Sequence, residues 1–170
     1  ILAHEAAGVP LEELGRALPG FGGVARRQEL VGEPGGIAVY DDFAHHPTAV
    51  LETLEALARR HRDGGVIAAF EPRSATACRR LHQAAYAGAF AAARAAVIAP
   101  VGRDLPAGER LDTARLAADL RARGVDARAA GDHGEVLDFV VDRARPGDAV
   151  ALLSNGAFGG LRGRLVEALS

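Results

Sequence analysis

The sequence predicts an α/β fold built on a mostly parallel, twisted sheet with helices on both faces. Continuous apolar runs recur at residues 66–70, 95–99 and 149–153. Strands that are apolar at every position are typical of parallel sheets, in which both faces are covered. Segments with helical periodicity separate these runs, and such alternation favours right-handed crossover connections. The predicted architecture is Rossmann-like, with an antiparallel strand added on its N-terminal side.

The N-terminal part predicts a short helical region followed by a hinge. Residues 1–18 contain two short helical pieces, and residues 19–23 read Pro-Gly-Phe-Gly-Gly, which is typical of a linker. We therefore expect a boundary that separates residues 1–20 from a domain formed by residues 21–170.

Two strands and a helix are expected next. Strands at 26–31 and 37–40 flank a turn rich in Gly and Pro, which favours antiparallel pairing. Pro47 suits the first position of a helix, because its missing N–H would have no helical partner there. Val50 and Leu54 belong to an apolar stripe with helical spacing.

The later elements follow from composition and capping signals. Residues 75–93 are rich in Ala and predict one long helix. Asp112 is expected to cap a helix that ends at Gly124. Asp132 with Glu135 three residues on resembles a capping box. Three further elements are expected: a strand at 125–129, a turn at 146–148 and a last helix that ends near Leu169.

The composition excludes several classes of function. The 170 residues suffice for one well-buried domain, and a formal net charge of -2 gives no reason to expect nucleic-acid or membrane partners. No apolar run approaches the roughly 20 residues that a bilayer span requires, and no signal peptide is found. Cys78 is the single cysteine, so no disulfide framework is expected. These features predict a cytoplasmic protein.

The sequence contains no lysine, so all 20 basic residues are arginine. A P-loop lysine, a Schiff-base lysine and the lysine of a receiver domain are therefore excluded. Any anion must be held by arginine, by backbone N–H groups or by helix ends.

Polar residues follow three of the predicted strands. The first segment is Tyr-Asp-Asp-Phe-Ala-His-His-Pro-Thr at 40–48, the second is Glu-Pro-Arg-Ser at 71–74, and the third is Ser-Asn-Gly-Ala-Phe-Gly-Gly at 154–160. The carboxyl ends of parallel strands lie at one edge of a sheet, where open α/β sheets bind ligands. One crevice could therefore hold all three segments.

Each segment also permits a purely structural interpretation. Asp41 or Asp42 could cap a helix or order a turn. The pair His45 and His46 suggests a metal, but no third ligand is nearby. Arg73 could be a surface residue, although its strand-end position favours carboxylate or phosphate recognition. Glycines in the third segment fit a loose nucleotide loop or tight helix packing. Other residues are expected in the core (Cys78) or at the surface or in caps (His4, His61, His82, His133).

Four motifs together resemble the C-terminal domain of the Mur ligases. These motifs are Arg-Arg-Gln-Glu at 26–29, the segment 40–49, Phe-Glu-Pro-Arg-Ser at 70–74, and the segment 154–160. Mur ligases are ATP-dependent enzymes that form amide bonds in peptidoglycan precursors. The combination is most similar to the murein peptide ligases, recycling enzymes that join UDP-N-acetylmuramate to L-alanyl-γ-D-glutamyl-meso-diaminopimelate.

The resemblance implies roles for the matched residues. It implies nucleotide contacts for Arg27, Asp42 and His45, with Arg27 at the phosphates and Asp42 at the ribose. It also implies ATP and Mg²⁺ as cofactors of the full-length enzyme, with the Mg²⁺ ligands in a central domain outside this chain. Residues 1–20 would be the tail of that central domain, and the isolated chain should not catalyse. The implied contacts to the peptide substrate are His46, Arg73, Ser74, Ser154 and Asn155.

Two alternatives remain open from the sequence. The related ligase that adds L-alanine usually carries a Gln-Pro-His-Arg type sequence, where this chain has Glu71-Pro72-Arg73. A stand-alone nucleotide-binding or regulatory α/β domain is the second alternative, since this architecture hosts many functions. Residues 32–36 do not supply the G-x-G-x-x-G pattern of a dinucleotide site.

Overall fold

The computed structural model describes residues 7–20 and 24–170, and within them a six-stranded sheet forms the centre of the molecule. The strand order is β1-β2-β6-β3-β4-β5. β1 pairs antiparallel with β2, and the other neighbours pair in parallel, which confirms the predicted fold class. The strands are β1 (Glu29–Gly32), β2 (Ala38–Asp42), β3 (Val66–Phe70), β4 (Ala95–Ile98), β5 (Asp126–Ala129) and β6 (Ala149–Leu153).

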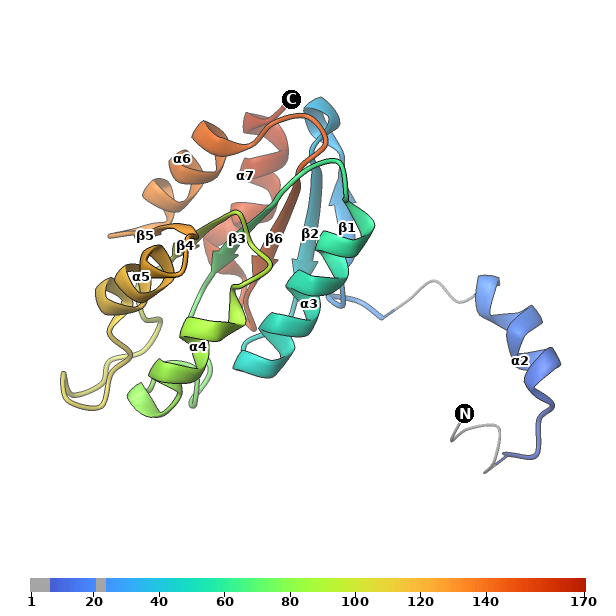
Figure 1. The fold of residues 1–170 in the computed structure, drawn as a ribbon, viewed down its shortest axis with the longest axis horizontal. Helices are drawn as coiled ribbons and strands as arrows, with labels where there is room; N and C mark the ends of the chain where they lie inside the picture. The colour runs from blue at the N-terminus through green and yellow to red at the C-terminus, as the bar shows by residue number, and fades with distance from the viewer. Residues whose placement is uncertain (1–6, 21–23) are drawn as a thin grey trace.

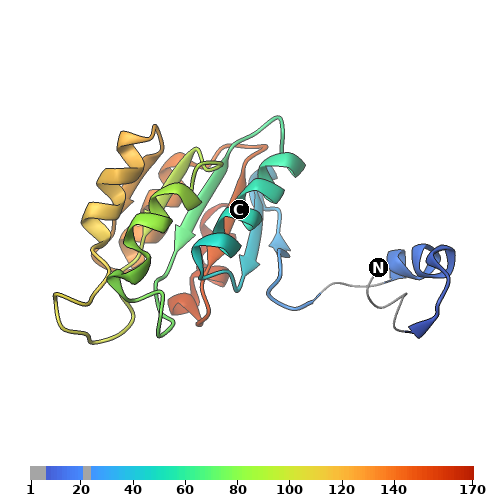
Figure 2. The ribbon, with the colours of Figure 1, turned by 60° about the horizontal axis from the view of Figure 1, so that its bottom comes forward.

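Helices cover both faces of the sheet (Figures 1 and 2). On one face lie α3 (Pro47–Arg60), α4 (Gln83–Ala89) and α5 (Thr113–Ala122), and on the other lie α6 (His133–Arg143) and α7 (Leu161–Ala168). The strands β3, β4 and β6 are apolar at every position because each contributes alternate side chains to two separate cores. Phe70 and Leu54 pack in the first core, whereas Leu152 and Phe139 pack in the second.

The start of α3 shows how the sequence fixes the helix that begins beside the polar strand end. Pro47 occupies the first helical position, as predicted, and His46 is the N-cap, with its Nδ1 accepting from the Thr48 N–H at 3.4 Å. Val50, Leu54 and Leu57 are fully buried beneath the helix. Burying each such side chain contributes roughly 1.5–3 kcal/mol, so the apolar stripe anchors α3 to the sheet.

The two capping predictions are confirmed. Asp112 Oδ1 accepts from the Arg115 N–H at 2.9 Å at the start of α5, and Asp132 Oδ1 accepts from the Glu135 N–H at 2.9 Å at the start of α6. The carboxylate of Glu135 accepts in turn from the N–H of Gly131, one residue before the cap. The two bonds to Asp112 and Asp132 satisfy N–H groups that lack a partner inside the helix.

The long helix predicted at 75–93 is wrong. A turn occupies the start of this region, followed by a 3₁₀ helix, η3 (Arg80–His82), and the seven-residue α4. The turn is stabilised by a bond from the Ala77 N–H to Ser74 Oγ at 3.0 Å and by a β-bridge between Arg79 and Arg110. Local capping and a tertiary bridge therefore override the helix propensity of an Ala-rich segment.

The bounds of the first two strands also differ from the prediction. β1 begins at Glu29 rather than at residue 26, because Arg26 and Gln28 both have left-handed backbone angles (φ 57° and 47°) that cannot continue a strand. β2 extends over Asp41 and Asp42, so these two carboxylates belong to the sheet rather than to the loop after it.

The N-terminal segment lies apart from the sheet (Figure 1). Helix α2 (Leu11–Ala17) is followed by the 3₁₀ helix η1 (Leu18–Gly20), and α2 buries no residue. Residues 1–6 and 21–23 lie outside the described residues, and with them most of the predicted first helical piece and of the predicted hinge at 19–23. The domain boundary at residue 21 therefore stays a prediction. Two further 3₁₀ turns are η2 (Pro34–Gly36) and η4 (Phe158–Gly160). None of the helices in the described ranges is long and apolar enough to cross a membrane.

Candidate functional site

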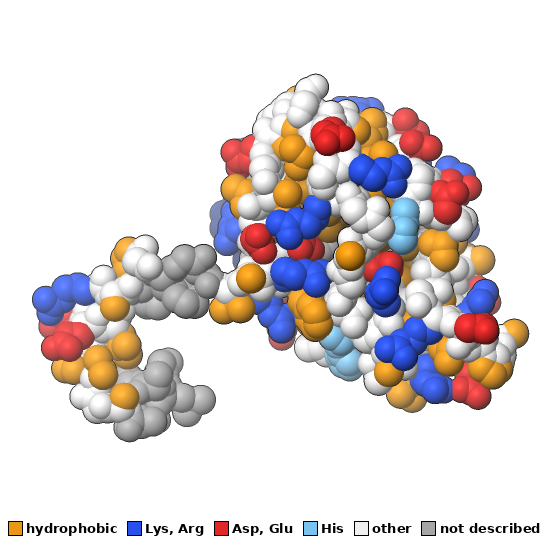
Figure 3. Space-filling model, turned by 180° about the vertical axis from the view of Figure 1, so that it is seen from behind, with side chains coloured by type: hydrophobic (Ala, Val, Ile, Leu, Met, Phe, Trp, Pro, Cys, Tyr) orange, Lys and Arg blue, Asp and Glu red, His pale blue; other side chains and the backbone are white. Residues whose placement is uncertain are grey.

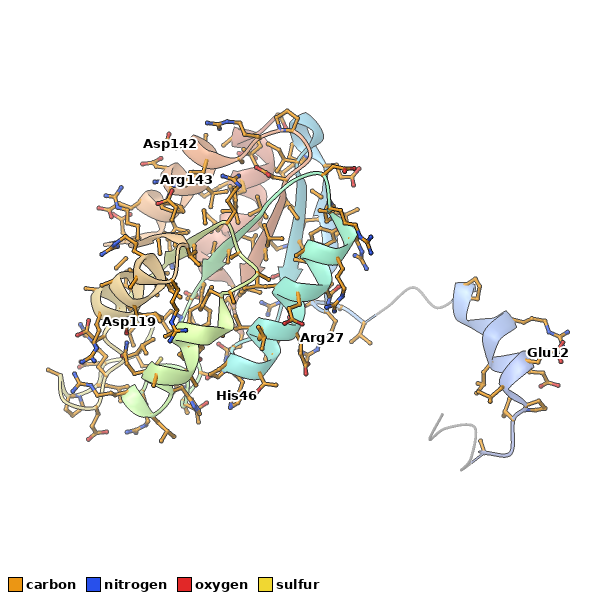
Figure 4. All side chains as sticks on the ribbon, viewed as in Figure 1. Glu12, Arg27, His46, Asp119, Asp142 and Arg143 are labelled. Atoms are coloured by element: carbon orange, nitrogen blue, oxygen red, sulfur yellow. The ribbon has the colours of Figure 1, made fainter. Side chains whose placement is uncertain are left out.

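The three polar strand ends meet at one edge of the sheet, as predicted. β6 lies between β2 and β3, and Leu153 is in register with both Asp42 and Phe70. The segments after these strands are therefore immediate neighbours. Figure 4 labels Arg27 and His46, which lie at this end of the molecule. We call this end of the sheet the carboxyl edge. It carries the segment before β1 and the loop after β2 on one side, and the loops after β3 and β6 on the other.

Asp42 is a buried carboxylate whose bonds lie within the domain. Its side chain accepts from the N–H of Gln28 at 2.8 Å, from the N–H of Ala44 at 2.7 Å, and from the hydroxyl of Thr53 at 3.4 Å. Asp42 is only 2% exposed. It therefore holds the left-handed turn at Gln28 against the start of the loop after β2.

Arg27 lies on that turn and is exposed, in contrast to Asp42. Its guanidinium carbon is 5.6 Å from the centroid of the Phe43 ring, and the same ring meets His45 edge-on at 5.3 Å. His45 is fixed by contact of its Nδ1 with the Phe43 carbonyl at 2.9 Å. Arg27 and His45 are thus placed around one aromatic ring, with the guanidinium of Arg27 accessible from outside.

Glu71 connects the loops after β3 and β6 to the start of α6. Its carboxylate accepts a short hydrogen bond from Ser154 Oγ, and its Oε1 lies 3.3 Å from Nε2 of His133. Ser154 Oγ also accepts from the N–H of Gly156 at 2.9 Å. His133, predicted to be a surface or capping residue, is 34% exposed at the first position of α6, and its ring also faces this buried acid. A contact across 62 positions has no local signal in the sequence.

Arg73 is half exposed at this edge, beside the buried Glu71. Its Nη1 lies 3.8 Å from Glu71 Oε1, and its carbonyl accepts from Nε of Arg103 at 2.9 Å. The side chain runs across Gly156 so closely that a Cβ on this glycine would lie 2.5 Å from Arg73 Cδ. The glycine therefore makes room for Arg73, and the guanidinium remains accessible.

Two other residues predicted to contact the substrate serve local structure in this conformation. Ser74 Oγ accepts from the N–H of Ala77, and the residue is buried. His46 is exposed as the cap of α3, with its ring 4.8 Å from that of His82 in an edge-on contact. Their predicted contacts with substrate stay predictions.

A network of charged residues joins the two sides of the carboxyl edge. Arg26 Nε lies 3.1 Å from Asp41 Oδ2, and its Nη2 donates to the carbonyls of Ser154 and Gly156 at 2.6 and 2.8 Å. Arg162, on α7, reaches the same Asp41 oxygen at 3.2 Å. No local signal in the sequence points to Arg162, because its partners are more than 100 positions away.

Glu29 completes this network on the outside of the sheet. A bond from the Arg26 N–H lowers the pKa of the Glu29 carboxyl below its ordinary value, and the charge of Arg162 lowers it further. The carboxylate therefore stays ionised and holds both arginines. Figure 3 views the molecule from behind, where Arg and acidic side chains are interleaved across the surface.

The described residues do not supply a site for Mg²⁺. Within residues 7–20 and 24–170, no group of three or more His, Cys, Asp or Glu side chains is placed to hold a metal ion. The acidic side chains at the carboxyl edge are instead bonded to backbone N–H groups, to Ser154 or to guanidinium groups.

The fold and its edge define a class of protein: an α/β domain that presents arginines from separate loops where parallel strands end. The family model described as "Mur ligase, glutamate ligase domain" matches residues 26–156. The chain belongs to this family.

Similar proteins agree on the family and differ in substrate. The chain is 38% identical to UDP-N-acetylmuramate–L-alanyl-γ-D-glutamyl-meso-2,6-diaminoheptandioate ligase of Escherichia coli K12, over 100% of this chain and 36% of the relative. It is also 38% identical to UDP-N-acetylmuramate–L-alanine ligase of Methylobacterium radiotolerans, over 91% of this chain and 33% of that protein. The crystal structure of a murein peptide ligase from Psychrobacter arcticus 273-4 matches with a TM-score of 0.73 and 30% identity, over 99% of this chain and 35% of that one. The chain thus spans about a third of these relatives.

Proposed function

We propose that this chain is the C-terminal domain of an ATP-dependent ligase that joins UDP-N-acetylmuramate to L-alanyl-γ-D-glutamyl-meso-diaminopimelate in peptidoglycan recycling. The observation that carries the proposal is the pair of accessible arginines, Arg27 and Arg73, at one carboxyl edge. Arg27 precedes Gln28, whose N–H is held by the buried Asp42, and Arg73 lies beside the buried Glu71. Membership of the Mur ligase family and the 38% identity to the Escherichia coli ligase support it.

The nucleotide side is proposed to be formed by Arg27, His45 and Asp42. The exposed guanidinium of Arg27 suits the phosphates of ATP, because a planar cation with several N–H donors matches phosphate oxygens. His45 would lie beside the nucleotide. Asp42 would meet the ribose hydroxyls only if one of its internal bonds were exchanged, and its present bonds make it the support of the turn that carries Arg27.

The peptide side is proposed to be formed by Arg73 and Asn155, with His46, Ser74 and Ser154 around them. Arg73 would bind a carboxylate of the peptide, since its fork of donors is accessible and its stem is placed by Gly156. The hydroxyl of Ser154 is already bonded to Glu71, so Ser154 would act chiefly by fixing the loop.

Catalysis would need the N-terminal and central domains of the same enzyme. Arg27 would lie at the phosphates of ATP, and Arg73 would orient the peptide so that its amine reaches the activated muramyl carboxylate. Closure of this domain over the site would exclude water and hold the reactants in place, which lowers the entropic part of the barrier. A cytoplasmic enzyme is proposed, because its nucleotide substrates are made there.

A second candidate function is that of the ligase that adds L-alanine. It is supported by the 38% identity to the Methylobacterium radiotolerans relative, which equals the identity to the Escherichia coli ligase. The two candidates differ at Glu71-Pro72-Arg73. A buried Glu71 holds Ser154 and places a carboxylate beside Arg73. The Glu-Pro-Arg sequence at 71–73, in place of the Gln-Pro-His-Arg type of the L-alanine ligases, favours the tripeptide ligase over the second candidate.

The experiment is an assay of the full-length enzyme that contains this chain, with ATP, UDP-N-acetylmuramate and one of three amines. We expect amide formation and ADP release with the tripeptide, and little with L-alanine or D-glutamate. Preference for L-alanine would establish the second candidate instead. The isolated chain is the matched control, and we expect it to release no ADP in any mixture.

A further inference from the structure

A cleft lies on the α7 side of the carboxyl edge and shares the loop after β6 with the surface that carries Arg73. Its volume is about 510 Å³, and it lies between the end of β2, the loop after β6 and the first turn of α7. This volume is large enough for a group of amino-acid size. The side chains that matter most for its chemistry are Arg26, Asp41, Asn155, Phe158 and Arg162.

The charge of this cleft favours an anion. Two guanidinium groups and one carboxylate line it, which leaves one formal positive charge. Arg26 and Arg162 both hold the same oxygen of Asp41, at 3.1 and 3.2 Å, so the spacing of the two guanidinium groups is fixed. Arg26 uses its Nη2 on the loop carbonyls, whereas the bonds found for Arg162 involve only its Nη1 and Nη2, leaving the Nε–H of Arg162 for a ligand.

The loop after β6 adds a second, independent feature. Asn155 Oδ1 is buried and has no hydrogen-bond partner among the described residues. A buried amide oxygen without a donor is destabilising, so a donor from a ligand would be favourable there. Leu152 and Phe158 give the cleft an apolar floor, and Phe158 is held in the left-handed region at φ 46°, which is rare for an aromatic residue.

We propose that this cleft is a second carboxylate subsite of the peptide substrate, which binds a carboxylate at Arg162 and the neighbouring N–H at Asn155. The ligand class is the carboxyl end of a peptide or amino acid, in which a carboxylate, an N–H group and an aliphatic carbon lie close together. The subsite rests on the proposed function, because the tripeptide has several carboxylates and Arg73 can bind only one of them. Arg26 is a positioning residue, since it fixes both Asp41 and the loop carbonyls.

Nuclear magnetic resonance titration of this chain tests the subsite directly. The probes are the tripeptide L-alanyl-γ-D-glutamyl-meso-diaminopimelate and the same peptide with its carboxylates amidated. We expect saturable shifts of the Arg162 Nε–H and Gly156 N–H signals with the first probe and none with the second. If both peptides shift these signals equally, or neither does, the proposal is wrong. Stronger shifts with inorganic phosphate than with the tripeptide would make the cleft a phosphate subsite and would also overturn it.

Matched variants separate binding from folding. Arg162→Gln should weaken tripeptide binding about tenfold or more, the typical effect of losing a charged hydrogen bond. Arg164→Gln is the control, because Arg164 is exposed on the same helix and makes no bond with any described residue. Asn155→Ala tests the role of the unpaired amide oxygen. We expect this variant to lose tripeptide binding and to keep its resonance signals outside the cleft unchanged. Equal affinity in the Arg162→Gln and Arg164→Gln variants would contradict the proposal.

Kinetics of the full-length enzyme distinguish failure of this inference from failure of the proposed function. Arg162→Gln should raise the KM for the tripeptide about tenfold and leave the KM for ATP unchanged. If the wild-type enzyme ligates the tripeptide but this variant has a normal tripeptide KM, the subsite is wrong and the function stands. If the wild-type enzyme does not use the tripeptide, the proposed function fails by itself.

Discussion

The two sides of the carboxyl edge each contain a buried carboxylate, but the two carboxylates have different kinds of partner. On each side a buried carboxylate stands next to an accessible arginine: Asp42 near Arg27, and Glu71 near Arg73. Asp42 accepts chiefly from backbone N–H groups of the turn and loop around β2. Glu71 instead contacts the side chains of two other elements, through Ser154 and His133.

The difference indicates what each side can tolerate. Bonds to backbone N–H groups fix the chain itself, so the turn that carries Arg27 depends on Asp42 for its local fold. Contacts between side chains instead fix the position of the loop after β3 against the loop after β6 and against α6. On both sides the buried acid fixes the surrounding loops, and the guanidinium of the arginine remains accessible from outside. This division predicts that acids and arginines will respond differently to substitution.

The largest expected effect is on stability, from Asp42→Ala. The substitution leaves the N–H groups of Gln28 and Ala44 without their acceptor at a buried position, so unfolding free energy should fall by about 2–4 kcal/mol. Urea unfolding of the isolated chain measures this change. Asp119→Ala is the control, because its pairing with Arg115 is a surface contact within one helix, and a change within about 0.5 kcal/mol is expected. A similar small change in both variants would mean that Asp42 does not support the fold.

A smaller and more selective effect is expected from Gly156→Ala. The new Cβ would meet the outer part of the Arg73 side chain, which can swing away, so the loop should keep its fold while Arg73 is displaced. In the full-length enzyme we expect a higher KM for the tripeptide and an unchanged KM for ATP. Gly64→Ala is the contrasting variant, since its Cβ would collide with the backbone of Gly147 and should destabilise the chain. Normal tripeptide kinetics in Gly156→Ala would show that the position of Arg73 does not matter.

The smallest effect concerns Cys78, which lies beneath the peptide-side loop. Its thiol donates to the Pro72 carbonyl, and burial raises the pKa of the thiol above its ordinary value of 9.0. The folded chain therefore keeps this proton when the unfolded chain loses it, so stability should fall as pH rises above 9.0. The contribution is at most about 1.4 kcal/mol per pH unit. Comparing urea unfolding of wild type and Cys78→Ala between pH 8 and pH 10 isolates it, and identical pH dependence would contradict this assignment.

The sequence was sufficient for the sheet and for the edge where the polar segments meet. Buried parallel strands can be recognised in a sequence as continuous apolar runs. The caps at Asp112 and Asp132 are local signals of where a helix begins. The region 75–93 could not be predicted in this way, because Ser74 and the Arg79–Arg110 bridge decide its structure. The burial of Asp42 also escaped prediction, since it depends on Gln28 and Thr53 across 14 and 11 positions.

The sequence predicts which segments form the candidate site, but it does not predict the contacts between them. Asp42 and Arg73 were identified from motifs, yet the partners that define their roles come from the folded chain. The links from Glu71 to His133 and from Asp41 to Arg162 join residues more than 60 positions apart. No local periodicity encodes such pairs, so the sequence could not predict the contacts of His133 and Arg162.

The central claim is that the two arginines serve different substrates, and crossed kinetics of the full-length enzyme test it most directly. Arg27→Ala and Arg73→Lys are assayed with ATP and the tripeptide varied in turn. We expect Arg27→Ala to raise the KM for ATP about tenfold or more and Arg73→Lys to raise the KM for the tripeptide by a similar factor, each with little effect on the other substrate. Thermal stability should remain nearly constant in both variants, because neither guanidinium is buried. If both variants change both constants together, or if Arg73→Lys lowers only the melting temperature, the assignment of separate substrates is contradicted.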